Sequence, residues 1–172
     1  MEFMRQVKHA QMVANKYLGQ PGDKLYIGSS DDGTENPLFD SKGLTKEVDV
    51  SEYLRKPIIS GDEQTLSEDL MKFRDTITSK MGKVDGKVMI VYTTNAVLNG
   101  VTSKTEDTVR KLKDEGWEVV FVISGDLGTG TRDMVLKLVG SPSRLVFLGG
   151  QGVVGDTILP NVIISKGIHR KC

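Results

Sequence analysis

Residues 87–93 read Lys-Val-Met-Ile-Val-Tyr-Thr, a short and almost unbroken apolar run that is rich in β-branched side chains. Gly82 and Gly86 precede the run, and a polar loop follows it. Such a run is typical of a strand buried on both faces inside a parallel sheet that helices cover. Because sheets of this kind bind ligands at the carboxyl ends of their strands, the loop 93–102 is the first place to look for function.

The second half of the chain alternates predicted strands and helices. In order, we expect a helix over 65–80, the strand at 87–93, a helix over 103–115, a strand at 117–124, a helix ending at Val139, a strand at 144–148 and a final helix over 156–170. Thr65 or Ser67 can cap the first of these helices. This alternation indicates right-handed βαβ units on a parallel sheet.

The first half is less regular. Residues 2–18 predict an amphipathic helix, whose apolar side chains at helical spacing are Met4, Val7, Met12, Ala14 and Leu18. Residues 24–28 predict a short strand, and Leu38 and Phe39 begin a second one, so the two form a β-hairpin around Asp32-Gly33. Residues 50–56 fit one helical turn that ends at Pro57.

Composition restricts the class of protein. A length of 172 residues fits one domain. Lys plus Arg and Asp plus Glu both number 23, so no overall field would attract nucleic acid or an anionic membrane. No apolar run is long enough for membrane insertion. The single cysteine, Cys172, fits a reduced cytosolic protein at least as well as a secreted one.

The glycine-rich loop 125–132 is the clearest candidate for chemistry. It follows a strand and opens a helix, which is the setting of a phosphate-binding loop. However, Arg132 follows Thr131 where a Walker motif needs a lysine before the Ser or Thr. We therefore expect a structural turn whose glycines supply backbone freedom, and nucleotide binding is the alternative. No residues pair a nucleophile with a base or gather as Cys/His ligands, so we expect no catalysis and no cofactor.

The order of these segments resembles a von Willebrand factor type A domain. The segments that carry the resemblance are the first helix, the hairpin, Lys-Val-Met-Ile-Val-Tyr-Thr-Thr-Asn at 87–95, the stretch 109–123, the stretch 141–147 and the stretch 159–172. The resemblance covers nearly the whole chain. It implies an α/β fold, namely a three-layer Rossmann-like sandwich with helices on both faces and a mostly parallel sheet carrying one antiparallel edge hairpin.

Many members of that family hold a divalent cation at the top of the sheet. The first metal-binding motif, Asp-x-Ser-x-Ser, has no counterpart here, because the chain begins within the helix that follows it. Thr65 is the nearest match to the family's threonine, and Thr94 stands where an aspartate is expected. Since a hard dication needs anionic or abundant oxygen ligands, we expect no metal. The remaining binding-surface candidates, after Thr94, are Asn95, Asn99 and Asp126.

The resemblance implies a non-catalytic adhesion module that binds a matrix or adhesive protein outside the cell, with neighbouring modules in a longer chain. It also makes Cys172 one half of a disulfide. Two alternatives stay open. One is a small cytosolic nucleotide-binding protein or enzyme that uses the loop 125–132, and the other is an intracellular scaffold of the same fold.

In the family the first strand lies at the centre of the sheet, between the strands placed here at 24–28 and 87–93. The chain begins too late to supply it, so either these two strands pair directly or a gap remains. Each buried apolar side chain lost with that strand is worth about 1.5–3 kcal/mol, against a total stability of about 5–15 kcal/mol. We therefore expect residues 1–172 to be incomplete at the N-terminus and marginally stable, and an added strand of about six residues to raise the melting temperature.

Overall fold

The computed structural model describes residues 2–17, 26, 28–29, 38–39, 63–82, 86–94, 98, 103–125, 128–141 and 144–148. Its elements are α1 (Glu2–Tyr17), β1 (Gly28–Ser29), β2 (Leu38–Phe39), α2 (Glu63–Met81), β3 (Lys87–Thr94), α4 (Ser103–Asp114), β4 (Trp117–Ser124), α5 (Thr129–Val139) and β5 (Leu145–Leu148). The helical segments expected at 50–56 and 156–170 lie outside the described residues.

The larger sheet has the order β3-β4-β5, and both pairings are parallel. Helix α4 lies between β3 and β4 in the sequence, and α5 lies between β4 and β5. The predicted βαβ alternation is therefore confirmed, and the fold belongs to the α/β class. Because parallel neighbours need a crossover connection, the two helices are a necessary part of this sheet.

The predicted hairpin is present, but its ladder is shifted along the chain. Strands β1 and β2 pair antiparallel, with Gly28 opposite Phe39. Tyr26, which the sequence placed in the strand, lies outside it and packs against the larger hydrophobic core. The predicted strand 24–28 is therefore wrong at Tyr26, which makes no strand pairing. The hairpin forms a sheet of its own, so the described residues show no direct pairing of β1 with β3.

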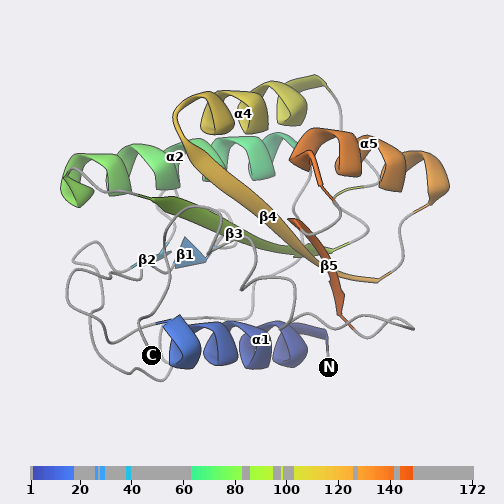
Figure 1. Ribbon diagram of the computed structural model, residues 1–172, viewed down its shortest axis with the longest axis horizontal. Coiled ribbons are helices and arrows are strands. Elements are labelled where there is room, and N and C mark those ends of the chain that lie inside the picture. Colours follow the sequence, from blue (N-terminus) through green and yellow to red (C-terminus); the bar gives the residue numbers. More distant parts are fainter. Residues whose placement is uncertain are drawn as a thin grey trace.

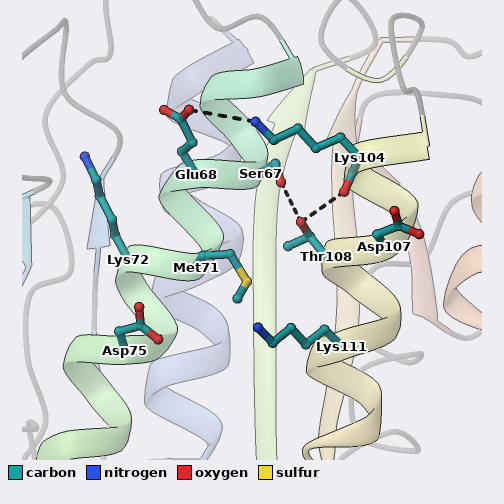
Figure 2. A pocket seen from close by; sticks show the side chains of 9 residues that line it. All are labelled: Ser67, Glu68, Met71, Lys72, Asp75, Lys104, Asp107, Thr108 and Lys111. Atoms are coloured by element: carbon teal, nitrogen blue, oxygen red, sulfur yellow. Dashed lines mark hydrogen bonds and ion pairs between the residues drawn. The ribbon is translucent and has the colours of Figure 1, made fainter.

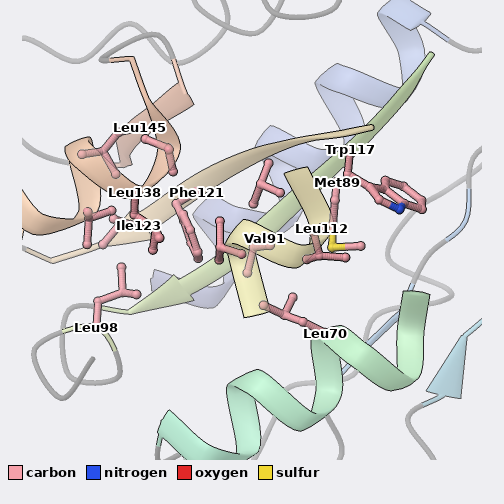
Figure 3. Close-up of a cluster of buried hydrophobic side chains, with 14 of the residues drawn as sticks. Leu70, Met89, Val91, Leu98, Leu112, Trp117, Phe121, Ile123, Leu138 and Leu145 are labelled. Atoms are coloured by element: carbon pink, nitrogen blue, oxygen red, sulfur yellow. The ribbon is translucent and has the colours of Figure 1, made fainter. Parts of the chain in front are cut away.

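The larger core lies between the sheet and the helices α2, α4 and α5 (Figure 3). Its most deeply buried members include Ile77, Val109, Leu112 and Phe121, which are at most 1% exposed. Leu66, Leu70 and Phe73 pack in the same cluster, so the apolar face predicted for α2 is confirmed. Burial of each large apolar side chain contributes about 1.5–3 kcal/mol, which makes this layer the main source of stability.

Helix α1 lies on the opposite side of the sheet from α2, α4 and α5 (Figure 1). Its Val13 joins a smaller cluster with Val120, Val122 and Val146. Met12, which the sequence placed on the apolar face, is 37% exposed. That prediction is wrong because Val7, His9 and Val13 are the buried positions, and one residue of helix turns the Met12 side chain about 100° away from Val13.

Strand β3 is buried less evenly than the sequence predicted. Met89, Val91 and Thr93 are buried, whereas Val88 and Ile90, on the other face, are only half-buried. Strand β4, by contrast, is buried on both faces along most of its length. The expectation of burial on both faces is therefore wrong for β3, which pairs with β4 alone among the described strands, and right for β4, which lies between β3 and β5.

Helix α2 begins earlier than expected, and this changes the role of two residues. The helix starts at Glu63, so Thr65 and Ser67 lie within it and neither is its cap. Ser67 is buried instead, and its Oγ lies 2.5 Å from Oγ1 of Thr108 on α4. The predicted closure of α4 by glycine is confirmed, since Gly116 follows the helix with φ of 92°.

Candidate functional site

The carboxyl ends of β3 and β4 meet at one edge of the sheet. Thr94, the last residue of β3, lies opposite Ser124, the last residue of β4, and Ser124 in turn lies opposite Leu148 of β5. Gly125 follows β4 with φ of 94°, a left-handed conformation that suits glycine. This edge, where ligands bind in open parallel sheets, is the candidate site.

Gln6 of α1 joins the ends of the two strands. Its side-chain amide donates one hydrogen bond to the backbone oxygen of Thr93 (2.9 Å) and another to Oγ of Ser124 (3.1 Å). One amide group thus uses both of its N–H donors to connect the carboxyl ends of β3 and β4. This contact fixes α1 against the candidate site.

A second polar contact from α1 lies close by. Nδ1 of His9 is 2.9 Å from the phenolic oxygen of Tyr92, and the two rings meet edge to face. His9 is only 5% exposed. Burial raises the pKa of Tyr92 above its ordinary range, because the charged phenolate would lose its hydration. The pair therefore places a neutral phenol two residues before Thr94.

Thr94 is the candidate binding residue that the structure describes at this edge. Its Oγ1 atom is buried and has no hydrogen-bond partner. Asn95, Asn99, Asp126 and Cys172 lie outside the described residues. Thr65 lies within helix α2, two residues after its start at Glu63.

The loop 125–132 combines two different backbone settings. Gly125 needs its left-handed conformation, as the sequence predicted. Gly128 has φ of −60°, and Gly130 lies in the helix. An added Cβ at either position would meet no atom within 4 Å. The prediction that these glycines are needed for their backbone freedom is therefore wrong for Gly128 and Gly130. The guanidinium of Arg132 lies 5.4 Å from the centre of the Phe147 ring, where it makes an exposed cation–π contact.

A groove of about 460 Å³ lies between α2 and α4, on the outer side of these helices. The Ser67–Thr108 contact closes it at one end, beside an ion pair of 3.9 Å between Lys104 and Glu68. Figure 2 shows Met71 and Lys111 directed toward the space between the helices. The lining carries three lysines and three carboxylates, so its charge favours neither anions nor cations.

Within the described residues, no group of three or more His, Cys, Asp or Glu side chains is placed to share a metal ion. Likewise, none of the helices in the described part of the chain is long and apolar enough to cross a bilayer.

Sequence reasoning missed Gln6 and Ser124. Ser124 carries a usable signal, because it is the last residue of a buried strand and directly precedes a glycine. Gln6 carries a weaker signal. It precedes His9 and Val13 by three and seven residues, the spacing of a single helix face, but a glutamine on such a face normally suggests solvent exposure.

Comparison with known proteins gave no relative: no family model matches the sequence, and neither the curated proteins nor the solved structures contain a match.

Proposed function

We propose that this chain is a non-catalytic protein-binding module with a three-layer Rossmann-like sandwich of the von Willebrand factor type A kind. The parallel order β3-β4-β5 and the position of α1 opposite the other helices support this fold, whereas the antiparallel hairpin β1–β2 forms a separate sheet within the described residues. The partner class follows from the resemblance and is a matrix or adhesive protein in an extracellular setting.

Thr94 is the observation that carries the proposal. It ends β3 at the carboxyl edge of the sheet, and its buried hydroxyl has no hydrogen-bond partner. A buried polar group without a partner costs about 1–3 kcal/mol. Rotation about χ1 moves the hydroxyl to another staggered position, where a bound partner recovers this cost by hydrogen bonding. Because a hydroxyl is neutral, we propose that the edge binds its partner directly and not through a divalent cation.

The test uses purified fibrillar collagen, fibronectin and laminin as probes on a biosensor surface. We expect saturable binding to at least one of them, unchanged by EDTA. Thr94→Val keeps the shape of the side chain and removes the hydroxyl, so it should weaken binding at least five-fold. The control is Thr76→Val on α2, whose hydroxyl donates only to the backbone oxygen of Lys72. Binding that EDTA abolishes, or an absence of binding to all three probes, would contradict the proposal.

The nucleotide-binding alternative rests on the start of α5, where open space borders Gly128 and Gly130 beside the exposed Arg132. A ligand that binds the folded state raises the melting temperature by mass action. We expect millimolar ATP or GTP to leave the melting temperature unchanged. A rise that Arg132→Ala removes would favour the nucleotide-binding function instead.

A further inference from the structure

Gln6 is placed to control the backbone directly before Thr94. Its Nε2 atom donates to the backbone oxygen of Thr93 at 2.9 Å. That oxygen belongs to the peptide group that joins Thr93 to Thr94, and a peptide group is a nearly rigid plane. The carbonyl of Thr93 and the N–H of Thr94 therefore turn together, so the hydrogen bond from Gln6 fixes the direction of both.

The second hydrogen bond of Gln6 reaches the neighbouring strand at the same edge. Nε2 also donates to Oγ of Ser124 at 3.1 Å. Ser124 lies directly opposite Thr94 in the parallel ladder and is only 1% exposed. A side chain in such close packing has little room to move. Gln6 thus connects the peptide group before Thr94 to a fully buried residue of β4.

Helix α1 holds Gln6 in place through two further contacts. One turn after Gln6, Nδ1 of His9 lies 2.9 Å from the phenolic oxygen of Tyr92. Two turns after Gln6, Val13 packs in the smaller hydrophobic cluster. Residues 6, 9 and 13 have the spacing of one helix face. The backbone of α1 is therefore held against the sheet on the face that carries Gln6, and the amide meets the strand ends at a fixed place.

Thr94 is the residue that this arrangement affects most directly. Its buried Oγ1 atom has no hydrogen-bond partner, and the proposed binding supplies one. Hydrogen bonds weaken steeply when donor and acceptor are misaligned. Rotation of the peptide group before Thr94 would redirect its Cα–Cβ bond and so displace the hydroxyl. The contact with a bound protein therefore needs a fixed peptide group at this point.

We propose that Gln6 is a positioning residue for Thr94, which holds the backbone at the end of β3 in the orientation that binding requires. This inference rests on the proposed function, in which Thr94 makes the contact with the bound protein. The alternative is that the two hydrogen bonds of Gln6 serve only to attach α1 to the sheet. The two roles differ in what they predict for Thr94.

The first experiment uses the protein without a partner. Gln6→Met keeps the length of the side chain and removes both N–H donors. The control is Val13→Ala, which loosens α1 at its apolar contact and leaves Gln6 unchanged. Nuclear magnetic resonance relaxation measures the order parameter of the Thr94 amide. We expect about 0.85 in the unmodified protein and in Val13→Ala, and a fall toward about 0.6 in Gln6→Met. If Gln6→Met does not fold, Gln6→Ala takes its place.

The second experiment measures binding to fibrillar collagen, fibronectin and laminin on the biosensor surface. Gln6→Met should weaken binding about three-fold, and no more than Thr94→Val does, because its effect passes through Thr94. Once Thr94→Val is present, Gln6→Met should weaken binding no further, which is full coupling in a double-mutant cycle. Val13→Ala should leave binding within about two-fold of the unmodified protein.

Two results would overturn the proposal. The first is an order parameter at Thr94 that stays the same in Gln6→Met or falls equally in Val13→Ala, since Gln6 would then only attach α1. The second is an additive loss of binding when Gln6→Met and Thr94→Val are combined. If the unmodified protein binds none of the three probes, the proposed function fails, and the order parameters still decide whether Gln6 positions Thr94.

Discussion

Tyr92 connects the two sides of the molecule at the scale of a single residue. It belongs to β3 and its hydroxyl contacts His9 of α1. Because burial favours the neutral phenol, its pKa lies higher in the folded protein than in the unfolded chain. A group with a raised pKa contributes stability that is complete below the unfolded pKa, about 10 for tyrosine, and is lost as the pH rises above it.

We therefore predict a steep loss of stability between about pH 10 and pH 11.5 that depends on Tyr92. Tyr92→Phe should cost about 1 kcal/mol at pH 8 through the lost hydrogen bond, and should flatten the decline at high pH. Urea unfolding at pH 8, 10 and 11 measures both effects. An equally steep decline in Tyr92→Phe would assign it to other groups.

Glu118 and Arg144 show how exposure decides the value of an ion pair. Nε of Arg144 donates to Oε2 of Glu118, and the two side chains are 23% and 15% exposed. This contact fixes the entry to β5 against β4.

Glu118→Gln should lower the free energy of unfolding by about 1–2 kcal/mol, because the largely buried guanidinium loses its counter-charge. The control is Glu106→Gln, which removes the i,i+4 pair with the exposed Arg110 and should cost about 0.3–0.5 kcal/mol. Equal costs in urea unfolding would show that burial of the first pair contributes nothing.

Among the elements, α5 has a glycine near each end, and the two have opposite requirements. Gly140 follows the helix with φ of 85°, and its backbone N–H donates to the oxygen of Leu136. Gly130 lies in the first turn, and an added Cβ there would meet no atom within 4 Å.

Gly140→Ala should therefore destabilise the protein by about 1–2 kcal/mol, because an alanine is strained in the left-handed conformation. Gly130→Ala should stabilise it by about 0.5–1 kcal/mol, because alanine loses less backbone entropy in a helix. Thermal unfolding of the two variants measures both signs. A destabilising Gly130→Ala would show that the start of α5 needs its glycine for another reason.

The elements that the sequence located best are those whose pattern is local. The boundaries of β4 were predicted to the residue, because its apolar run ends at Ser124 and Gly125. The bounds of β1 were predicted less well, because a strand of two residues depends on its antiparallel partner β2 and not on a local apolar pattern. The inner face of α1 was predicted in part: Val7 is buried as expected, whereas Gln6 and His9, which bond to groups of the sheet, were not expected there.

At the scale of the whole molecule, the two sides of the sheet differ in the size of their hydrophobic clusters. The cluster on the side of α2, α4 and α5 contains Phe121 with an exposure of 0%, whereas the α1 side is built around Val13, Val120, Val122 and Val146. Among the described side chains, α1 is attached by Val13 and by the hydrogen bonds of Gln6 and His9. The sequence predicted helices on both sides of the sheet. The difference in size between the two described hydrophobic clusters could be seen only from the packing of the side chains.

Phe121→Ala should cost about 3–5 kcal/mol through lost burial and the cavity left behind, which is a large part of a total of about 5–15 kcal/mol. Val13→Ala should cost only about 1–2 kcal/mol, the value of two buried methyl groups. In hydrogen exchange, Val13→Ala should raise the rates in α1 while α4 keeps its protection. Equal exchange increases in both helices would mean that the two sides unfold as one unit.

The contact between Gln6 and Ser124 spans 118 residues of sequence. A ribosome adds about 5–20 residues per second, so about 6–24 s pass between the synthesis of Gln6 in α1 and that of Ser124 in β4. In the pure protein the same separation makes this contact late, because a long loop must close before it forms. Gln6→Ala should then speed unfolding and leave the folding rate unchanged in stopped-flow experiments, with Lys8→Ala, an exposed position of α1, as the control. Helix α1 is therefore synthesised well before the strand residue that holds it in place.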